Sequence, residues 1–194
     1  MKQRFEQLEG LPTPDILPEI TALGLDWGPS NQICINTVEP GSDDYQLGTG
    51  SLKYDWANKR PVTLPDGSTK WEVPEYSVQY DESDFQYLVD IFQGTLIESV
   101  YGALDDSGYK LGRIRLMRNE PKTCLSWHVD TSPRLHFPVK THTGCFMVIE
   151  DEVRHLPERT WWMTNTTLPH TAFNASRESR IHLVACILNK HSNL

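Results

Sequence analysis

The sequence predicts a mainly β protein with flanking helices, in which antiparallel strands form a sandwich or barrel. After Gly108 the hydrophobic period becomes two, or gives short continuous apolar runs, in segments of strand length. Breaks rich in Pro, Gly, Asn and Asp separate these segments, and no helical pattern lies between them. Many short, closely spaced strands are typical of an antiparallel sandwich or barrel.

The first half of the chain gives the weakest signal. Residues 10–80 are rich in Pro and Gly, and short apolar runs such as residues 33–35 indicate irregular structure around one or two strands. This half is expected to supply part of a pocket rim. Tyr54, Trp56 and Trp71 are candidates for lining it, although loop aromatics are as often simple packing residues.

An amphipathic helix is expected to follow. From Ser83 to Val100 apolar residues recur at three- and four-residue steps, Ser83 is a suitable N-cap, and no proline interrupts the run. We expect this helix to cover one side of a sheet. The strands predicted after it are residues 109–118, 123–129, 134–141, 145–150, 160–164, 168–173 and 181–189.

Length and composition indicate one folded domain. The chain has 194 residues, of which 38% are hydrophobic and 23% charged, enough for a core without disulfides or structural metals. We expect a single domain over residues 1–194, in which residues 1–108 pack on a barrel formed by residues 109–190. The net charge of −8 and the lack of a basic run make a nucleic-acid partner improbable.

Cysteine usage and hydropathy point to a soluble protein of a reducing compartment. Four cysteines lie far apart with no Cys-x-x-Cys pair, and we expect all of them to be reduced and buried. Neither a secretory signal at residues 1–6 nor a membrane-spanning run is found, so a cytoplasmic location is expected. The oligomeric state is not indicated.

Three side chains form a candidate metal site. His128 and Asp130 are two residues apart, a spacing that puts both side chains on one side of an extended segment. His170 lies on a later predicted strand that an antiparallel sandwich can bring alongside. Two histidines and one carboxylate are the facial arrangement of non-haem iron oxygenases, because it leaves coordination positions open for co-substrate and oxygen.

His-x-Asp alone is a weak signal in a chain with 7 histidines, and His142, His155, His182 and His191 are most simply surface or core residues. Cationic residues nearby strengthen the interpretation. Arg180 follows His170 by ten residues, and a guanidinium matches the far carboxylate of 2-oxoglutarate, the co-substrate of such oxygenases. Arg134 and His136 share one side of a strand and complete a candidate anion site, because buried negative charge needs nearby cations.

Residues 110–190 resemble the aspartyl/asparaginyl β-hydroxylase family and its bacterial relatives that hydroxylate free proline. The resemblance is carried by Pro121, by His128-Val129-Asp130, by Arg134-Leu135-His136, by the segment 158–161 and, most specifically, by the segment 170–180. Asp130 places the chain nearer the three-ligand branch, similar to the proline hydroxylases, because the animal enzymes lack that carboxylate. Lys122 and Met117 depart from residues common among relatives.

The resemblance implies a double-stranded β-helix, the jelly-roll barrel also seen in cupins. It implies that His128, Asp130 and His170 bind Fe(II), that Arg180 holds the far carboxylate of 2-oxoglutarate, and that Arg134 and His136 help to bind it. The implied activity is an O2-consuming dioxygenase that hydroxylates an amino-acid side chain, free or within a peptide or protein, and releases succinate and CO2. No side chain beyond the metal ligands is needed as a catalytic base.

Two other functions are compatible with the same residues. A cupin-like module could hold metal or a small ligand without turnover, although the full ligand set and Arg180 weigh against it. A zinc hydrolase could use the same three ligands, but it would give Arg134, His136 and Arg180 no shared purpose.

Overall fold

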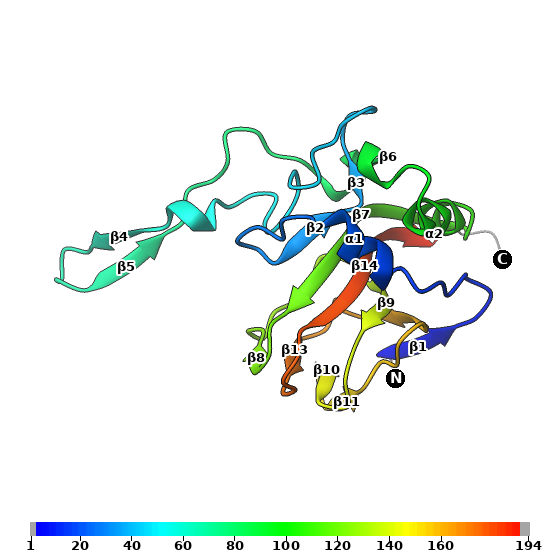
Figure 1. Ribbon diagram of the computed structural model, residues 1–194. Helices are drawn as coiled ribbons and strands as arrows, with labels where there is room; N and C mark the ends of the chain where they lie inside the picture. Colours follow the sequence, from blue (N-terminus) through cyan, green and yellow to red (C-terminus); the bar gives the residue numbers. More distant parts are fainter. Residues whose placement is uncertain (1–2, 191–194) are drawn as a thin grey trace.

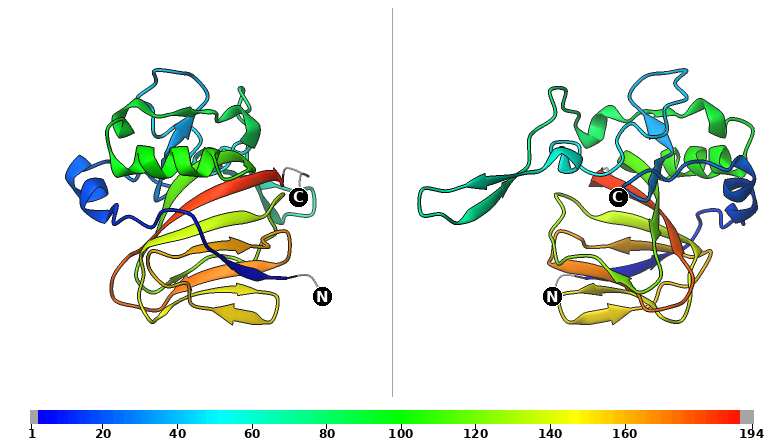
Figure 2. Two further views of the ribbon diagram at one scale, coloured as in Figure 1. Left: turned by 90° about the vertical axis from the view of Figure 1, so that its right-hand side faces the viewer. Right: turned by 60° about the vertical axis from the view of Figure 1, so that its left-hand side comes forward.

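The computed structural model describes residues 3–190, and two facing antiparallel sheets form its centre (Figures 1 and 2). One sheet has six strands in the order β1-β12-β9-β14-β7-β2, and the other has four in the order β11-β10-β13-β8. The strands from β7 onward are β7 (Tyr109–Asn119), β8 (Thr123–Cys124), β9 (Arg134–Lys140), β10 (Cys145–Ile149), β11 (Glu152–Arg154), β12 (Trp161–Thr164), β13 (His170–Asn174) and β14 (Arg180–Lys190).

Strands β7 to β14 have the connectivity of a jelly roll. The chain passes between the two sheets from β7 to β8, β9 and β10, and again from β11 to β12, β13 and β14, so that four of these strands lie in each sheet. The expected double-stranded β-helix is therefore confirmed. Most predicted strands are also found, but β11 was missed, and the predicted strand 123–129 ends at Cys124.

The two sides of the six-stranded sheet differ in polarity. Ile114, Leu116, Leu135, Phe137, Leu183 and Ala185 belong to the main apolar core. The alternate residues of the same strands, among them Arg113, Arg115, Arg134, His136 and Arg180, line a cavity between the two sheets. Because successive side chains of a strand point to opposite sides, the period of two separates core from cavity.

N-terminal elements extend the large sheet at its edges and cover its apolar side. They are β1 (Phe5–Leu8), α1 (Leu17–Leu23), β2 (Gln32–Cys34), β3 (Asn36–Thr37), β6 (Tyr87–Leu88) and α2 (Leu96–Asp105). Strand β1 pairs with β12 and β2 pairs with β7, so the sheet extends at both edges. Helix α1 ends at Gly24, whose left-handed conformation (φ 59°) lets its N–H bond the carbonyl of Thr21.

The predicted helix from Ser83 to Val100 is wrong over its first two thirds. This stretch forms the 3₁₀ turn η2 (Glu82–Asp84), strand β6 and the 3₁₀ turn η3 (Asp90–Phe92), and α2 begins only after Thr95. The N–H of Val89 donates to the carbonyl of Ile35 (2.9 Å), a long-range bond that a helix would exclude. Phe85, Val89 and Phe92 are buried as expected, but by a turning chain rather than by a helix, whereas Leu96 is exposed.

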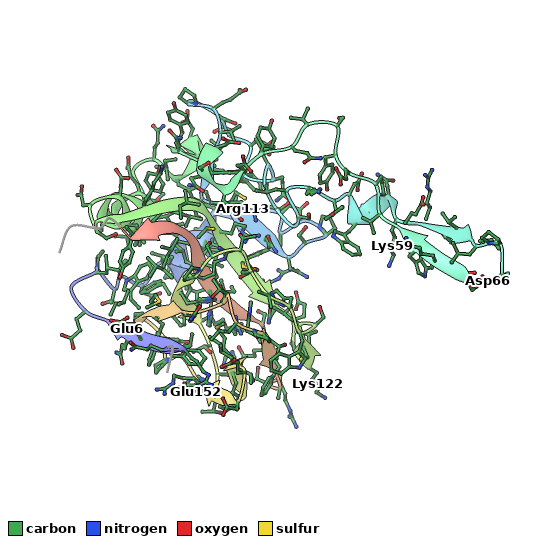
Figure 3. All side chains as sticks on the ribbon, turned by 180° about the vertical axis from the view of Figure 1, so that it is seen from behind. Glu6, Lys59, Asp66, Arg113, Lys122 and Glu152 are labelled. Atoms are coloured by element: carbon green, nitrogen blue, oxygen red, sulfur yellow. The ribbon has the colours of Figure 1, made fainter. Side chains whose placement is uncertain are left out.

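The region 10–80 contains more regular structure than predicted. Besides α1, β2 and β3 it forms η1 (Trp56–Asn58) and a hairpin of β4 (Arg60–Thr63) and β5 (Thr69–Glu72). This hairpin projects from the body of the molecule, as Lys59 and Asp66 show in Figure 3. Trp56 and Trp71 are exposed there and do not line the central cavity, whereas Tyr54 does.

All four cysteines are free, as predicted, but only Cys34, Cys145 and Cys186 are buried. Cys124 is exposed because β8 lies at the edge of the small sheet, where no further strand covers it. No helix within residues 3–190 is long and apolar enough to cross a bilayer. His191 lies outside the described residues.

Candidate metal centre

His128 and His170 are held side by side by the backbone of two neighbouring segments. The N–H of His128 donates to the carbonyl of His170 (3.1 Å), and the N–H of His170 donates to that of His128 (2.9 Å). This isolated antiparallel bridge leaves the two imidazole centroids 4.2 Å apart. His128 therefore lies in an extended segment after β8 rather than in the predicted strand, yet the pairing with β13 places it as expected.

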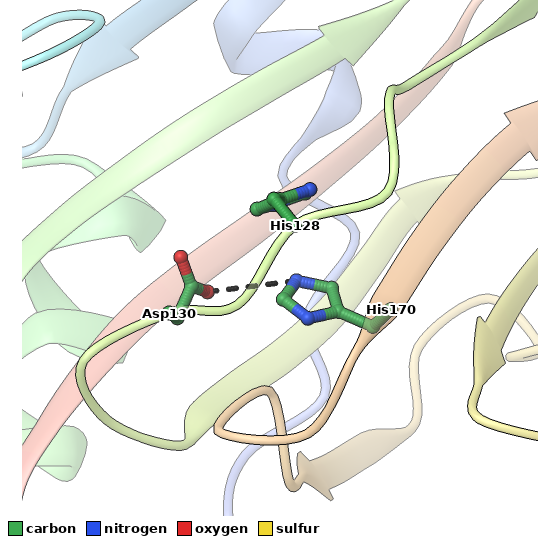
Figure 4. Close-up of side chains that lie close together, drawn as sticks. All are labelled: His128, Asp130 and His170. Atoms are coloured by element: carbon green, nitrogen blue, oxygen red, sulfur yellow. Dashed lines mark ion pairs between the residues drawn. The ribbon is translucent and has the colours of Figure 1, made fainter.

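Asp130 completes a group of three potential ligands (Figure 4). Its N–H donates to the carbonyl of Thr166 (2.9 Å), which fixes the backbone two residues after His128. The ligand atoms of His128, Asp130 and His170 all lie within 4.8 Å of one another. Adjacent ligands around an ion with bonds of about 2.1 Å lie roughly 3 Å apart, so the three side chains are close to the spacing that one shared ion requires.

Both imidazoles present the same ring nitrogen to this centre. The Nδ1–H of His128 donates to the carbonyl of Ser126 (2.8 Å), and the Nδ1–H of His170 donates to that of Leu168 (3.0 Å). A carbonyl can only accept, so these bonds fix the tautomer and leave each Nε2 lone pair free. Burial lowers the pKa of His170 and so favours the neutral ring that binds metals.

The carboxylate of Asp130 is oriented by a neighbouring guanidinium. Its Oδ2 lies 3.3 Å from Nε of Arg134 and 3.7 Å from Nε2 of His170. The other end of the Arg134 guanidinium is also occupied, because Nη1 donates to the Oγ of Ser132 and to the Sγ of Cys186, both at 2.6 Å. Arg134 thus supports the metal centre through Asp130, and its predicted part in co-substrate binding stays a prediction.

The three ligands open into a cavity of about 520 Å³ between the sheets. Four buried arginines line it: Arg113, Arg115, Arg134 and Arg180. Glu82, from η2, accepts two bonds from Arg113 (2.9 and 3.2 Å) and lies 3.9 Å from Arg134. A strongly cationic cavity in a chain of net charge −8 indicates an anionic ligand.

Arg180 has no acidic partner. Within residues 3–190 no carboxylate forms an ion pair with it, and its buried Nε has no hydrogen-bond acceptor. Burial lowers its pKa to about 10, so the guanidinium remains charged at neutral pH. A buried, unpaired cation is expensive, and a bound carboxylate would neutralise it.

His136 also lines the cavity, from β9, where it pairs with Val184 of β14. Burial, followed by the charge of Arg180, holds the pKa of His136 well below its ordinary value, so the ring is neutral. Its Nδ1 lies 3.4 Å from Nδ1 of His182, a buried residue that sequence reasoning had set aside. A neutral imidazole in the same cavity as Arg180 offers a further hydrogen-bonding group to an anionic ligand.

All six predicted site residues therefore line the same cavity. Sequence reasoning missed Arg113, Arg115, Glu82 and His182. The two arginines had a signal, since they alternate with Ile114 and Leu116 along one predicted strand. Glu82 had none, because it comes from an irregular segment that only the tertiary fold brings to the cavity.

The fold and the site together define a jelly-roll protein in which two histidines and one carboxylate form a candidate metal centre in an arginine-lined cavity. Comparison with known proteins agrees with this class. Residues 94–189, about half of the chain, match the family described as aspartyl/asparaginyl β-hydroxylase. The chain belongs to this family.

Among characterised relatives, L-proline cis-4-hydroxylase of Rhizobium meliloti is 32% identical over 76 residues, which cover 36% of this chain and 27% of that protein. The chain thus matches little more than a quarter of that relative's length. Two solved structures are also similar. AviO1 of Streptomyces viridochromogenes has a TM-score of 0.45 at 15% identity over 98% of this chain and 92% of that one. An oxidoreductase of the 2OG-Fe(II) oxygenase family from Burkholderia pseudomallei has a TM-score of 0.37 at 12% identity, over 70% of this chain and 71% of that one.

Proposed function

We propose that this chain is an Fe(II)- and 2-oxoglutarate-dependent dioxygenase that hydroxylates the side chain of an amino acid, free or within a peptide, and that residues 1–194 act as one oxygenase domain. One observation carries the proposal: the unpaired guanidinium of Arg180 lies in the same cavity as His128, Asp130 and His170. A metal centre without an adjoining anion site would serve other metal chemistry equally well.

In this proposal His128, Asp130 and His170 hold the ion, and Arg180 with His136 holds the far carboxylate of 2-oxoglutarate. Iron(II), 2-oxoglutarate and O2 together supply an oxidant for an unactivated C–H bond, with succinate and CO2 as co-products. The charges balance, since a divalent ion and Arg180 offset Asp130 and the dianion.

The remaining residues position and enclose the site. Arg134 keeps the Asp130 carboxylate turned toward the two imidazoles, and the carbonyls of Ser126 and Leu168 keep both Nε2 atoms toward the ion. The apolar Val184 and Met147 line the cavity between the polar groups and keep water away from the reacting carbon. The family membership and the proline-hydroxylating activity of the Rhizobium meliloti relative support an amino-acid substrate.

The proposal is tested by adding iron(II) and 2-oxoglutarate to the protein under nitrogen and recording the visible charge-transfer band of the chelate. We expect the band in the wild type and in His142→Ala, which removes an imidazole remote from the centre, and its loss in Asp130→Ala and His170→Ala. An identical band in all four proteins would contradict the metal assignment.

Turnover separates this function from its two alternatives. In air, with ascorbate and a panel of free amino acids and peptides, an oxygenase forms succinate, whereas a cupin-like binding module or a zinc hydrolase forms none. Succinate release that is absent from Arg180→Met but present in His142→Ala is the expected result. A failure of every substrate to raise succinate above the substrate-free rate would count against hydroxylation.

A further inference from the structure

A second guanidinium in the cavity also lacks an acidic partner. Arg115, on β7, is buried and has no carboxylate within ion-pair distance in the described part of the chain. Its Nη1 donates to the Oε1 of Gln32 (2.9 Å) and lies 3.5 Å from the carbonyl of Gly50. Its Nε has no acceptor, and no hydrogen bond of its Nη2 is found among residues 3–190.

Two of the three acidic side chains that line the cavity are already engaged by other arginines, and the third, Asp81, caps the 3₁₀ turn η2. Glu82 is held by two bonds from Arg113 and lies close to Arg134, and Asp130 is held by Arg134 and faces the metal centre. The four arginines therefore exceed the three carboxylates that line the cavity by one positive charge before any metal binds. At the mouth, Lys53 pairs with Glu75 and does not change this excess.

Arg115 and Arg180 lie at different ends of the cavity. Strand β14 has Arg180 opposite Asn119 and Val184 opposite Arg115, so the two arginine positions are separated by four residues along the sheet. At about 3.3 Å per residue this is roughly 13 Å. A five-carbon dicarboxylate held by Arg180 and the metal has no carboxylate left for Arg115.

We propose that Arg115 binds a carboxylate of the substrate itself, so that the cavity accepts two anions, 2-oxoglutarate at Arg180 and the substrate at Arg115. The inference rests on the proposed function and specifies its substrate class as a carboxylic acid. The α-carboxylate of a free amino acid and the acidic side chain of a peptide share this chemistry. The free N–H groups of Arg115 present the planar fork that a carboxylate fits.

Other features of the residue agree with a binding role. The bond to Gln32 fixes the guanidinium from the side of β2, which leaves the opposite edge toward the cavity that Arg115 lines. Burial lowers the pKa of Arg115 to about 10, so it is still a cation at neutral pH. A purely structural role would leave its Nε–H buried without an acceptor.

The test compares free acids with their amides. Metal-free protein is titrated by thermal shift and by calorimetry with each standard L-amino acid as the free acid and as the α-carboxamide, and with a capped peptide containing one internal aspartate. The wild type should bind at least one acid about 30-fold or more tightly than its amide, the ratio expected when a charged partner is truncated. Arg115→Met should reduce this ratio to near unity.

Arg118→Met is the matched control. Arg118 also belongs to β7, but its guanidinium bonds the Oδ1 of Asn31 (2.6 Å) and pairs with Glu120, away from this cavity. The Arg118→Met variant should keep the wild-type ratio of acid affinity to amide affinity. If Arg115→Met does not fold, Arg115→Lys takes its place and should lower the ratio at least about 10-fold, because an ammonium cannot form the two parallel bonds.

The outcomes separate the two proposals. An acid preference that survives in the Arg115 variant, or a wild type that prefers no acid over its amide, overturns the subsite even if succinate is formed. If the preference for the acid over its amide depends on Arg115 but the protein forms no succinate, the result supports the subsite and contradicts the proposed oxygenase function. Tighter, Arg115-dependent binding of the capped peptide supports the subsite and assigns the carboxylate to a side chain.

Discussion

Arg180→Met separates an anion-binding role from a structural one, because the two roles predict opposite changes in stability. In the ligand-free protein the guanidinium is 4% exposed and has no acidic partner. Burial lowers its pKa from the ordinary value of arginine to about 10. At about 1.4 kcal/mol per pKa unit this corresponds to roughly 3 kcal/mol against folding with the charge present.

Methionine fills a similar space without charge, so we expect Arg180→Met to raise the free energy of unfolding by about 1–3 kcal/mol. The same substitution removes the partner of the far carboxylate of 2-oxoglutarate. Truncating one side of such a pair costs about 2–5 kcal/mol, so the dissociation constant of 2-oxoglutarate should rise by at least about 30-fold. The variant should therefore be more stable and bind its co-substrate less tightly.

Urea denaturation of the metal-free protein gives the stability, and calorimetric titration of the manganese-loaded protein gives the affinity for 2-oxoglutarate. Arg113→Met is the control, since it also removes a cavity arginine but leaves the Glu82 carboxylate without its two bonds. It should destabilise the protein by about 3 kcal/mol. If Arg180→Met destabilises the ligand-free protein as Arg113→Met does, Arg180 is structural and the argument fails.

Three further substitutions test other parts of the structure. Arg134→Met removes the guanidinium that orients the Asp130 carboxylate, and metal titration should show a loss of affinity of about 10–100-fold. Unchanged metal affinity would show that Arg134 does not position Asp130 for metal binding. Burial holds the pKa of His182 well below 6.5, so its contribution to stability is complete above that pH and is lost as the pH falls and the unfolded chain takes up a proton. In His182→Gln, the free energy of unfolding measured with urea should depend less on pH below 6.5, by about 1.4 kcal/mol per pH unit. The same pH dependence in the variant and the wild type would contradict a neutral His182 ring. Gly112→Ala would place a Cβ 2.6 Å from the carbonyl oxygen of Glu82 and should lower the free energy of unfolding by about 1–3 kcal/mol, whereas Gly102→Ala, with nothing within 4 Å, should not.

Local alternation made the barrel predictable. In β9, β10, β13 and β14 the segments expected from the sequence agree with the structure to within about two residues at each end, a usual margin for such boundaries. The His-x-Asp spacing also succeeded outside a regular strand. Any extended backbone puts residues two apart on one side, so His128 and Asp130 converge although β8 has already ended.

The expected helix from Ser83 failed for a non-local reason. Its three- and four-residue period correctly identified buried positions such as Phe85 and Phe92. Whether the chain buries them as a helix or as a sequence of turns depends on where its backbone N–H groups find acceptors. Here the carbonyl of Ile35, more than fifty residues earlier, provides one.

The sequence by itself determined most of the barrel's strand pattern, the three candidate metal ligands and the cationic residues around them, because these depend on side-chain type and on spacing along an extended chain. Only the tertiary structure decided which cations are free. Glu82 neutralises Arg113 from 31 residues away, while Arg115 and Arg180 receive no carboxylate within residues 3–190. Ion pairing acts through space over a few ångströms, and no local pattern encodes which distant segment arrives within that range.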